Sequence, residues 1–192
     1  MCAPCGSCAA VVGDMTVKPA LQTVRLALRP ARPEDAANLL ELDRDPEVRR
    51  FVDQPDEPTL ALMEAAIGRV LAIDASDPGI GFWMAEFEGR FAGWFHMKPP
   101  REGEPAEPGD MELGYRLHRH LWGRGLATEG SRELIRYAFA ELEAPRVTAC
   151  AMVENRASTR VMEKLGMRLW RTWTGRRRSG DEWSAVTYAL AR

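Results

Sequence analysis

The chain has 192 residues and a mass of 21.5 kDa, with 45% hydrophobic and 28% charged residues. This composition is typical of a folded globular domain, and it excludes disordered, collagen-like and membrane-spanning chains. With 26 basic and 28 acidic residues, the formal net charge is -2, so no overall positive field would attract nucleic acid or an anionic membrane. No signal peptide is evident, and we expect one cytoplasmic domain.

The first 20 residues contain small residues, prolines and three of the four cysteines, without helical or strand periodicity. We therefore expect a flexible leader over 1–20 and a single domain over 21–192. The spacing Cys-x-x-Cys-x-x-Cys resembles part of a metal or cluster site, but such sites normally need four ligands, and the fourth cysteine lies in a predicted strand. We expect no metal, and metal binding by the leader remains a weaker alternative. The leader cysteines are Cys2, Cys5 and Cys8.

Periodicity predicts the following elements in chain order. Alternation from Thr23 predicts a strand with Val24, Leu26 and Leu28 on one face. A helix follows near Pro33, and the next helix covers about 59–73. The remaining predicted elements are a hairpin of strands 82–87 and 90–98, a loop 99–110, a strand 111–117, a helix 125–142, a strand 146–153, a helix from Asn155 to Gly166, and strands 168–174 and 183–190.

This order predicts an α/β (α+β) fold with a mixed, mostly antiparallel sheet of about seven strands and about four helices. One parallel crossover would surround the helix at 125–142.

The most informative segment is 117–128, where a strand end, a glycine turn and a helix start follow one another. Gly123 and Gly125 have no Cβ to block close approach, and the backbone N–H groups of the turn can point at one anion, reinforced by the helix dipole. A diphosphate suits this site, and Arg119 and Arg124 could add charge-assisted contacts. The alternative is a helix start that binds nothing. The pattern lacks the residues of a nucleotide P-loop and of the dinucleotide fingerprint.

The run Trp122-Gly-Arg-Gly-Leu-Ala127 resembles the pyrophosphate motif Gln/Arg-x-x-Gly-x-Gly/Ala of the GNAT superfamily of N-acetyltransferases, with Trp122 in the first place. Its continuation into Ala127-Thr128-Glu129 is similar to the Rim-type branch, the ribosomal-protein N-terminal acetyltransferases and their small-molecule relatives.

Two further segments resemble the same branch and occur in family order. Glu154-Asn-Arg-Ala-Ser158 is followed by Glu163-Lys-Leu-Gly166, with Met167 where phenylalanine is usual. The third match is the opening Leu28-Arg-Pro-Ala-Arg-Pro-Glu-Asp-Ala36 with Asp45-Pro-Glu-Val48.

The resemblance implies a GNAT-like sheet with a V-shaped splay between its fourth and fifth strands, and acetyl-CoA or another acyl-CoA as cosubstrate. It also implies which residues contact the coenzyme. These are Leu117, Trp122, Gly123, Arg124, Gly125, Leu126, Ala127, Thr128 and Asn155.

By the same resemblance, Glu112 occupies the place of a general base, and Ser158 takes the role of proton donor to the leaving thiolate. Each residue has a structural alternative. Glu112 could belong to a solvated strand face, and Ser158 could bond only to the backbone of its own helix. Asn155 would be a good helix cap whether or not it also contacts coenzyme.

The resemblance therefore implies an acyl-CoA-dependent N-acyltransferase that moves acetyl to a primary amine by direct attack on the thioester. The acceptor would be a protein N-terminal α-amine or a small-molecule amine. A succinyl-CoA-using relative and a non-catalytic acyl-CoA-binding module are the alternatives. We expect neither nucleic acid nor a membrane as a partner, and homodimerisation is left open.

Overall fold

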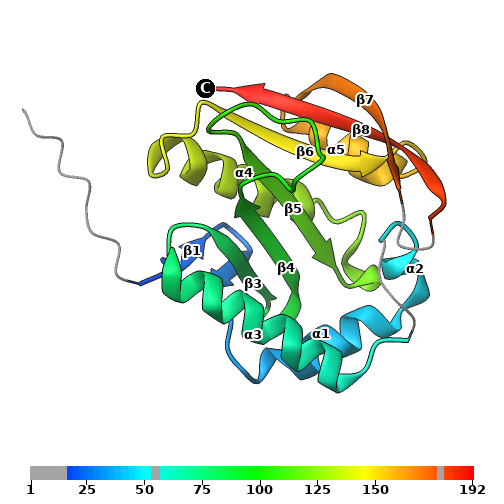
Figure 1. Cartoon of the computed structure of the whole chain (residues 1–192). Helices are drawn as coiled ribbons and strands as arrows, with labels where there is room; N and C mark the ends of the chain where they lie inside the picture. The colour runs from blue at the N-terminus through cyan, green and yellow to red at the C-terminus, as the bar shows by residue number, and fades with distance from the viewer. Residues whose placement is uncertain (1–16, 53–56, 177–179) are drawn as a thin grey trace, which may run out of the picture.

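The structure is a computed structural model that describes residues 17–52, 57–176 and 180–192. Within these residues, eight strands form one sheet in the order β1-β2-β3-β4-β5-β6-β8-β7, with helices on both faces (Figure 1). The strands are β1 Leu21–Gln22, β2 Leu26–Arg29, β3 Gly81–Phe87, β4 Arg90–Lys98, β5 Met111–Leu117, β6 Arg146–Met152, β7 Arg168–Arg176 and β8 Glu182–Ala191. The helices are α1 Asp35–Arg44, α2 Pro46–Arg49, α3 Leu60–Ser76, η1 Arg119–Leu121 (a 3-10 turn), α4 Leu126–Ala140 and α5 Arg156–Lys164.

Strands β5 and β6 run parallel and are joined through α4, whereas the other neighbouring strands of this sheet pair antiparallel. Their pairing covers only two positions, Met111 with Val147 and Glu112 with Thr148. Beyond these positions the two strands diverge (Figure 1). The predicted parallel crossover is confirmed, and so is the splay, because β5 and β6 are the fourth and fifth predicted strands.

The paired end of β5 and β6 is held by side chains. The carboxylate of Asp110, a buried residue, accepts hydrogen bonds from Arg146 Nε and Nη2 at 2.9 and 2.7 Å. The Arg146 guanidinium also lies 3.9 Å from the ring centroid of Trp170. A bidentate pair of this kind fixes both distance and direction, so the strands are anchored at one end and free to separate at the other.

Successive apolar side chains of the central strands point to opposite faces of the sheet and form two hydrophobic cores, one on each face. The core on the α4 face includes Trp83 and Phe95 with Leu134. The core on the other face packs Met84 against α1 and α3, through residues such as Leu39 and Ile67. A strand exposes successive side chains to opposite faces, and this places neighbouring residues of β4 and β5 in different surroundings.

The N-terminal strand differs from its prediction. The chain forms a turn at Thr23 before β2 begins, and Val24 is 95% exposed rather than buried. Thr23 Oγ1 accepts hydrogen bonds from the N–H groups of Arg25 and Leu26, at 3.3 and 2.8 Å. A threonine hydroxyl that binds the backbone two or three residues ahead favours a turn over an extended strand. Strand β1, which the sequence did not predict, precedes this turn.

Smaller differences concern the helices. Leu60, predicted to be buried, is half-exposed at the start of α3, and Ala157 is exposed on α5. Helix α2, also unpredicted, begins because Asp45 accepts a hydrogen bond from Glu47 N at 2.9 Å. Local capping explains this short helix, which has too few residues to show periodicity.

The domain makes contacts before residue 21, where the sequence placed its start. Lys18 is buried, lies 3.0 Å from Asp74 and stacks 4.0 Å from the ring centroid of Trp83. Trp83 Nε1 donates to the carbonyl of Pro19 at 2.8 Å. The three leader cysteines lie outside the described residues. None of the helices in the described ranges is long and apolar enough to cross a membrane.

Close packing between α4 and β4 can be tested at Gly130. A Cβ added there would lie 2.4 Å from Phe95 Cζ, a buried ring atom. We expect Gly130→Ala to lower the free energy of unfolding by about 1–3 kcal/mol, since overpacking outweighs the better helix propensity of alanine. Gly68→Ala on α3 is the control, because its Cβ would meet nothing within 4 Å. Urea denaturation of both variants checks this, and a Gly130→Ala variant as stable as wild type would contradict it.

Candidate active site

The turn between β5 and α4 is built by two glycines and a tryptophan. Gly123 and Gly125 have φ angles of 73° and 81°, in the left-handed region where a side chain is strained. Trp122 Nε1 donates to the carbonyl of Leu117 at 2.8 Å. The indole therefore ties the turn back to the end of β5, which gives Trp122 a structural reason to replace the usual first motif residue.

This turn presents unpaired backbone donors. The first hydrogen bond of α4 runs from Glu129 N to Gly125 O at 3.0 Å. Among the described residues, no acceptor is recorded for the N–H groups from Gly123 to Thr128. A Cβ on Gly123 would meet nothing within 4 Å, so the space beside these donors is open. Unpaired N–H groups at the positive end of a helix dipole fit the diphosphate of coenzyme A.

The three cations around the turn differ in their contacts. The guanidinium of Arg124 stacks over Phe87, 4.6 Å from the ring centroid. Arg119 is exposed on the 3-10 turn. Arg25, which the sequence did not single out, approaches instead, with its Nη2 3.5 Å from the position of a Cβ on Gly125.

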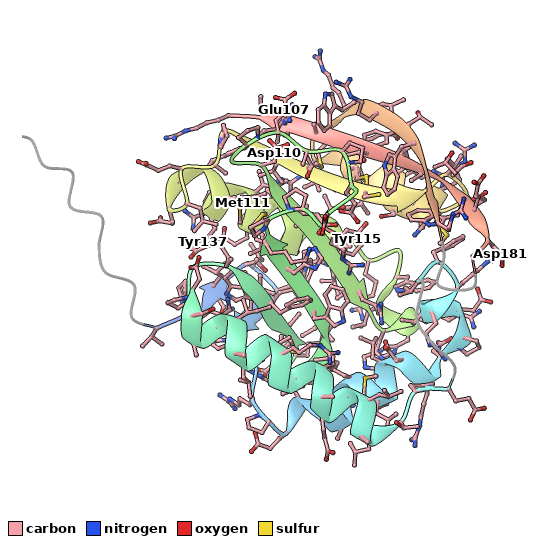
Figure 2. The ribbon with its side chains drawn as sticks, viewed as in Figure 1. Glu107, Asp110, Met111, Tyr115, Tyr137 and Asp181 are labelled. Carbon is pink, nitrogen blue, oxygen red and sulfur yellow. The ribbon has the colours of Figure 1, made fainter. Side chains whose placement is uncertain are left out.

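On the α4 face of β5, the structure brings two hydroxyl groups together. Tyr115 lies on β5 (Figure 2). Its Oη is 3.1 Å from Ser158 Oγ. Burial raises the pKa of Tyr115, although the hydrogen bond with Ser158 opposes that shift, so the phenol is protonated at neutral pH. Asn155 caps α5, with its side chain accepting from Ser158 N at 3.2 Å. The cap therefore orients the first turn of α5 and places Ser158 beside Tyr115.

Sequence reasoning missed Tyr115, although strand alternation could have found it. Tyr115 lies three positions beyond Glu112 on β5, and residues an odd number apart on a strand point to opposite faces. Glu112 therefore points to the other face, where α1 and α3 pack. The two predicted catalytic residues, Glu112 and Ser158, lie on different sides of the sheet.

Glu112 has two basic neighbours on β4. Its carboxylate pairs with Lys98, and Oε2 lies 3.4 Å from His96 Nε2. Burial would raise the pKa of Glu112, but His96 and Lys98 favour its charged form and lower that pKa to about 2. Glu112 is thus a permanent anion at neutral pH rather than a group on a solvated strand face.

His96 is buried, and its Nδ1 has no hydrogen-bond partner among the described residues. Burial lowers the pKa of His96 more than Glu112 raises it, which keeps the imidazole neutral. The ring lies against Gly114, where a Cβ would approach Nε2 to 2.5 Å. It also stacks on Trp94, with 5.7 Å between ring centroids. Gly114 therefore makes the space that this ring occupies.

A cleft of about 1220 Å³ opens on this face between the sheet and the helices α1 and α3. Its floor includes His96, Glu112 and Cys150, and its apolar wall includes Met63 and Val70. This volume exceeds the few hundred Å³ that a small ligand needs. The cleft can therefore hold a sizeable acceptor, with a fixed negative charge at its floor.

Comparisons with known proteins agree with this architecture. The acetyltransferase (GNAT) domain model matches residues 25–168. FsC-acetyl coenzyme A-N(2)-transacetylase of Aspergillus fumigatus is 34% identical over 194 residues, covering 93% of this chain and 79% of the relative. The solved acetyltransferase of Agrobacterium tumefaciens str. C58 is 26% identical with a TM-score of 0.70, covering 91% of this chain and 95% of that one.

The fold is also that of RimL, the ribosomal L7/L12 α-N-protein acetyltransferase, whose structure in complex with coenzyme A superposes with a TM-score of 0.76. The match covers 90% of this chain and 98% of that one, at 16% identity. The family model and the fungal relative both extend over most of the sequence. The chain therefore belongs to the GNAT acetyltransferase family and is an N-acetyltransferase.

Proposed function

We propose that this enzyme transfers acetyl to the uncharged nitrogen of a primary amine, either an α-amine or an amine of a small molecule, in the gap between β5 and β6. The observation that supports this most directly is the pairing of these strands over only two positions. The cleft lies on the α1 and α3 face of these strands, and the hydroxyl pair lies on their α4 face. The name of the fungal relative states transfer to an N(2) position, which supports a nitrogen acceptor.

The coenzyme would bind along the open edge of β5 and the turn that follows it. The N–H groups from Gly123 to Thr128 would hold the diphosphate. Backbone groups of β5 up to Leu117 have no partner strand on the β6 side beyond Glu112, and would bind the amide groups of the pantetheine arm. When bound, acetyl-CoA supplies an activated acetyl thioester.

On the acceptor side, Glu112 would bind the ammonium form of the amine and draw it to the floor of the cleft. With a pKa of about 2, this carboxylate is a weak proton acceptor, so the amine must lose its proton largely by its own acidity. An α-amine has a pKa near 8, whereas that of lysine is about 10.4. The site therefore favours an α-amine or another amine of low pKa.

On the coenzyme side, the pair formed by Tyr115 and Ser158 would protonate the leaving sulfur. The hydroxyl that gives its proton regains one through the hydrogen bond to the other, 3.1 Å away. The proton that the nitrogen releases as the amide forms then restores the pair by way of solvent. This keeps Ser158 in the role that the resemblance implied and adds Tyr115 as its partner.

Turnover and cofactor binding need separate measurements. We expect thiol release from acetyl-CoA in the presence of amines of low pKa, and coenzyme A binding by calorimetry. Binding without turnover on a broad amine panel would instead favour the acyl-CoA-binding module, and turnover with succinyl-CoA alone would favour the succinyl alternative.

Gly125→Glu tests the coenzyme site. We expect it to abolish coenzyme A binding, because it places a side chain and a negative charge among the donors of the turn. Gly166→Glu at the end of α5 is matched in backbone conformation, since Gly166 also has φ 81°. Calorimetry should show coenzyme A affinity retained in Gly166→Glu. Equal affinity in both variants would refute the site.

Tyr115→Phe tests the proton donor. We expect a fall in kcat of about 10²-fold, within the usual range for loss of general acid catalysis, with coenzyme A affinity unchanged. Ser158→Ala should cost less if Tyr115 gives the proton directly, because the phenol remains. An unchanged kcat in Tyr115→Phe would remove this residue from the chemistry.

Glu112→Gln tests the fixed charge of the cleft. We expect kcat/KM to fall about 10-fold or more, because a hydrogen bond to a charged group contributes about 1.5–3 kcal/mol. The folded-state pKa of Glu112 lies below its ordinary value of 4.5. The stabilisation it provides is therefore present above pH 4.5 and is lost as the pH falls toward 2.

The unfolding free energies of wild type and Glu112→Gln should accordingly differ at pH 7 and converge between pH 4.5 and 2. Glu133→Gln is the control, since Glu133 pairs with Arg136 on the surface of α4 and should change little at either pH. A difference that does not vary with pH would contradict the depressed pKa of Glu112.

A further inference from the structure

A clamp of long-range hydrogen bonds joins the Thr23 turn to the first turn of α4. The carboxylate of Glu129 accepts from Thr23 Oγ1 at 2.6 Å, and from Arg25 N and Nε at 2.8 and 2.7 Å. Over 100 residues of sequence separate the partners. Glu129 completes the Ala-Thr-Glu run that follows the glycine turn. It belongs neither to the N–H groups from Gly123 to Thr128 nor to the hydroxyl pair.

The guanidinium of Arg25 is held in one orientation by this clamp. Its Nε and Nη2 both approach Glu129 Oε2, at 2.7 and 2.6 Å, and its Nη1 donates to the carbonyl of Arg124 at 3.0 Å. A guanidinium carries five N–H donors. These contacts use three of them, which leaves one donor on each terminal nitrogen.

The two remaining donors lie beside the turn. Arg25 Nη2 is 3.5 Å from the position of a Cβ on Gly125, so the cation is adjacent to the unpaired N–H groups. The side chain of Arg25 is 40% exposed, whereas that of Glu129 is 17% exposed. The carboxylate therefore lies behind the guanidinium, whose outer edge is open to a ligand.

The state of Glu129 agrees with an orienting role. Burial would raise its pKa, but the hydrogen bonds from Thr23 and Arg25 outweigh this effect and lower it. The carboxylate of Glu129 is therefore ionised at neutral pH and pairs with the guanidinium of Arg25. Arg124, the cation expected from the motif, packs over Phe87 instead. Arg25 is thus the better oriented cation at the turn.

We propose that Arg25 belongs to the diphosphate site, where its two remaining N–H groups bind phosphate oxygens, and that Glu129 is its positioning residue. This inference rests on the proposed coenzyme site. Because Glu129 balances the charge of Arg25, the guanidinium contributes directed hydrogen bonds more than net charge. Planar, oriented donors suit phosphate oxygens, which a lysine would meet only as a point charge.

Calorimetric titration of coenzyme A and of 3′-dephospho-coenzyme A tests the proposal. We expect Arg25→Gln to weaken both ligands by about 10-fold, since both contain the diphosphate and a charged hydrogen bond contributes about 1.5–3 kcal/mol. Arg25→Lys should recover only part of the affinity. Arg136→Gln is the matched control, because Arg136 also pairs with a glutamate of α4 but lies in the last turns of that helix. The Arg136→Gln variant should bind both ligands with the affinity of wild type.

Glu129→Gln separates orientation from charge. A purely electrostatic effect predicts tighter binding, because a negative charge near the phosphates disappears. Our assignment predicts weaker binding, by a smaller factor than Arg25→Gln, because the guanidinium loses its fixed direction. Tighter binding by Glu129→Gln would therefore overturn the positioning role.

Two other results would overturn the assignment of Arg25. Unchanged affinity in Arg25→Gln, with only a lower melting temperature, would show that the clamp is merely structural. A loss confined to coenzyme A would place Arg25 at the 3′-phosphate instead. Failure of wild type to bind either ligand would refute the proposed coenzyme site itself, so the two failures are distinguishable.

Discussion

The arrangement of the site depends on how far β5 and β6 remain paired. The ion pair between Asp110 and Arg146 holds the two strands together where both begin, and backbone pairing stops after Glu112 and Thr148. Parallel strands buried in a sheet would normally continue their hydrogen-bond ladder, because unpaired backbone groups are costly away from water. In the proposed site, this unpaired edge would bind the amide groups of the coenzyme.

The position of the anion site follows from the same topology. Because β5 runs from the closed end to the open end of the gap, the turn after Leu117 lies at the open end, and α4 begins there. The helix must cross back to start β6 at the closed end, so its positive N-terminus is beside the unpaired strand edge. The crossover from β5 through α4 to β6 therefore places the unpaired edge of β5 next to the N–H groups at the start of α4. The clamp from Glu129 to the Thr23 turn fixes this helix end against β2.

Local signals in the sequence were sufficient for the elements that depend on local interactions. The glycine turn, the cap at Asn155 and the left-handed Gly166 are properties of neighbouring residues, and the structure has them where they were predicted. Contacts between distant segments were not predictable in this way. The spacing of residues does not show that Lys98 pairs with Glu112, that Tyr115 meets Ser158, or that Arg25 reaches the α4 turn. The Val24 prediction failed for a local reason, because the Thr23 hydroxyl competes with the extended conformation.

The side chains near the gap also bear on whether the reaction forms a covalent acetyl-enzyme intermediate. Within the described residues Cys150 is the single cysteine, and it lines the cleft together with Glu112. Burial, with the charges of Glu104 and Glu112, raises the pKa of its thiol to about 12, so the nucleophilic thiolate is scarce at neutral pH. Ser158 contacts a tyrosine rather than a base that could activate it. With neither side chain activated, the residues at the gap suit the proposed direct transfer, in which the amine itself would attack the thioester and the hydroxyl pair would protonate the sulfur.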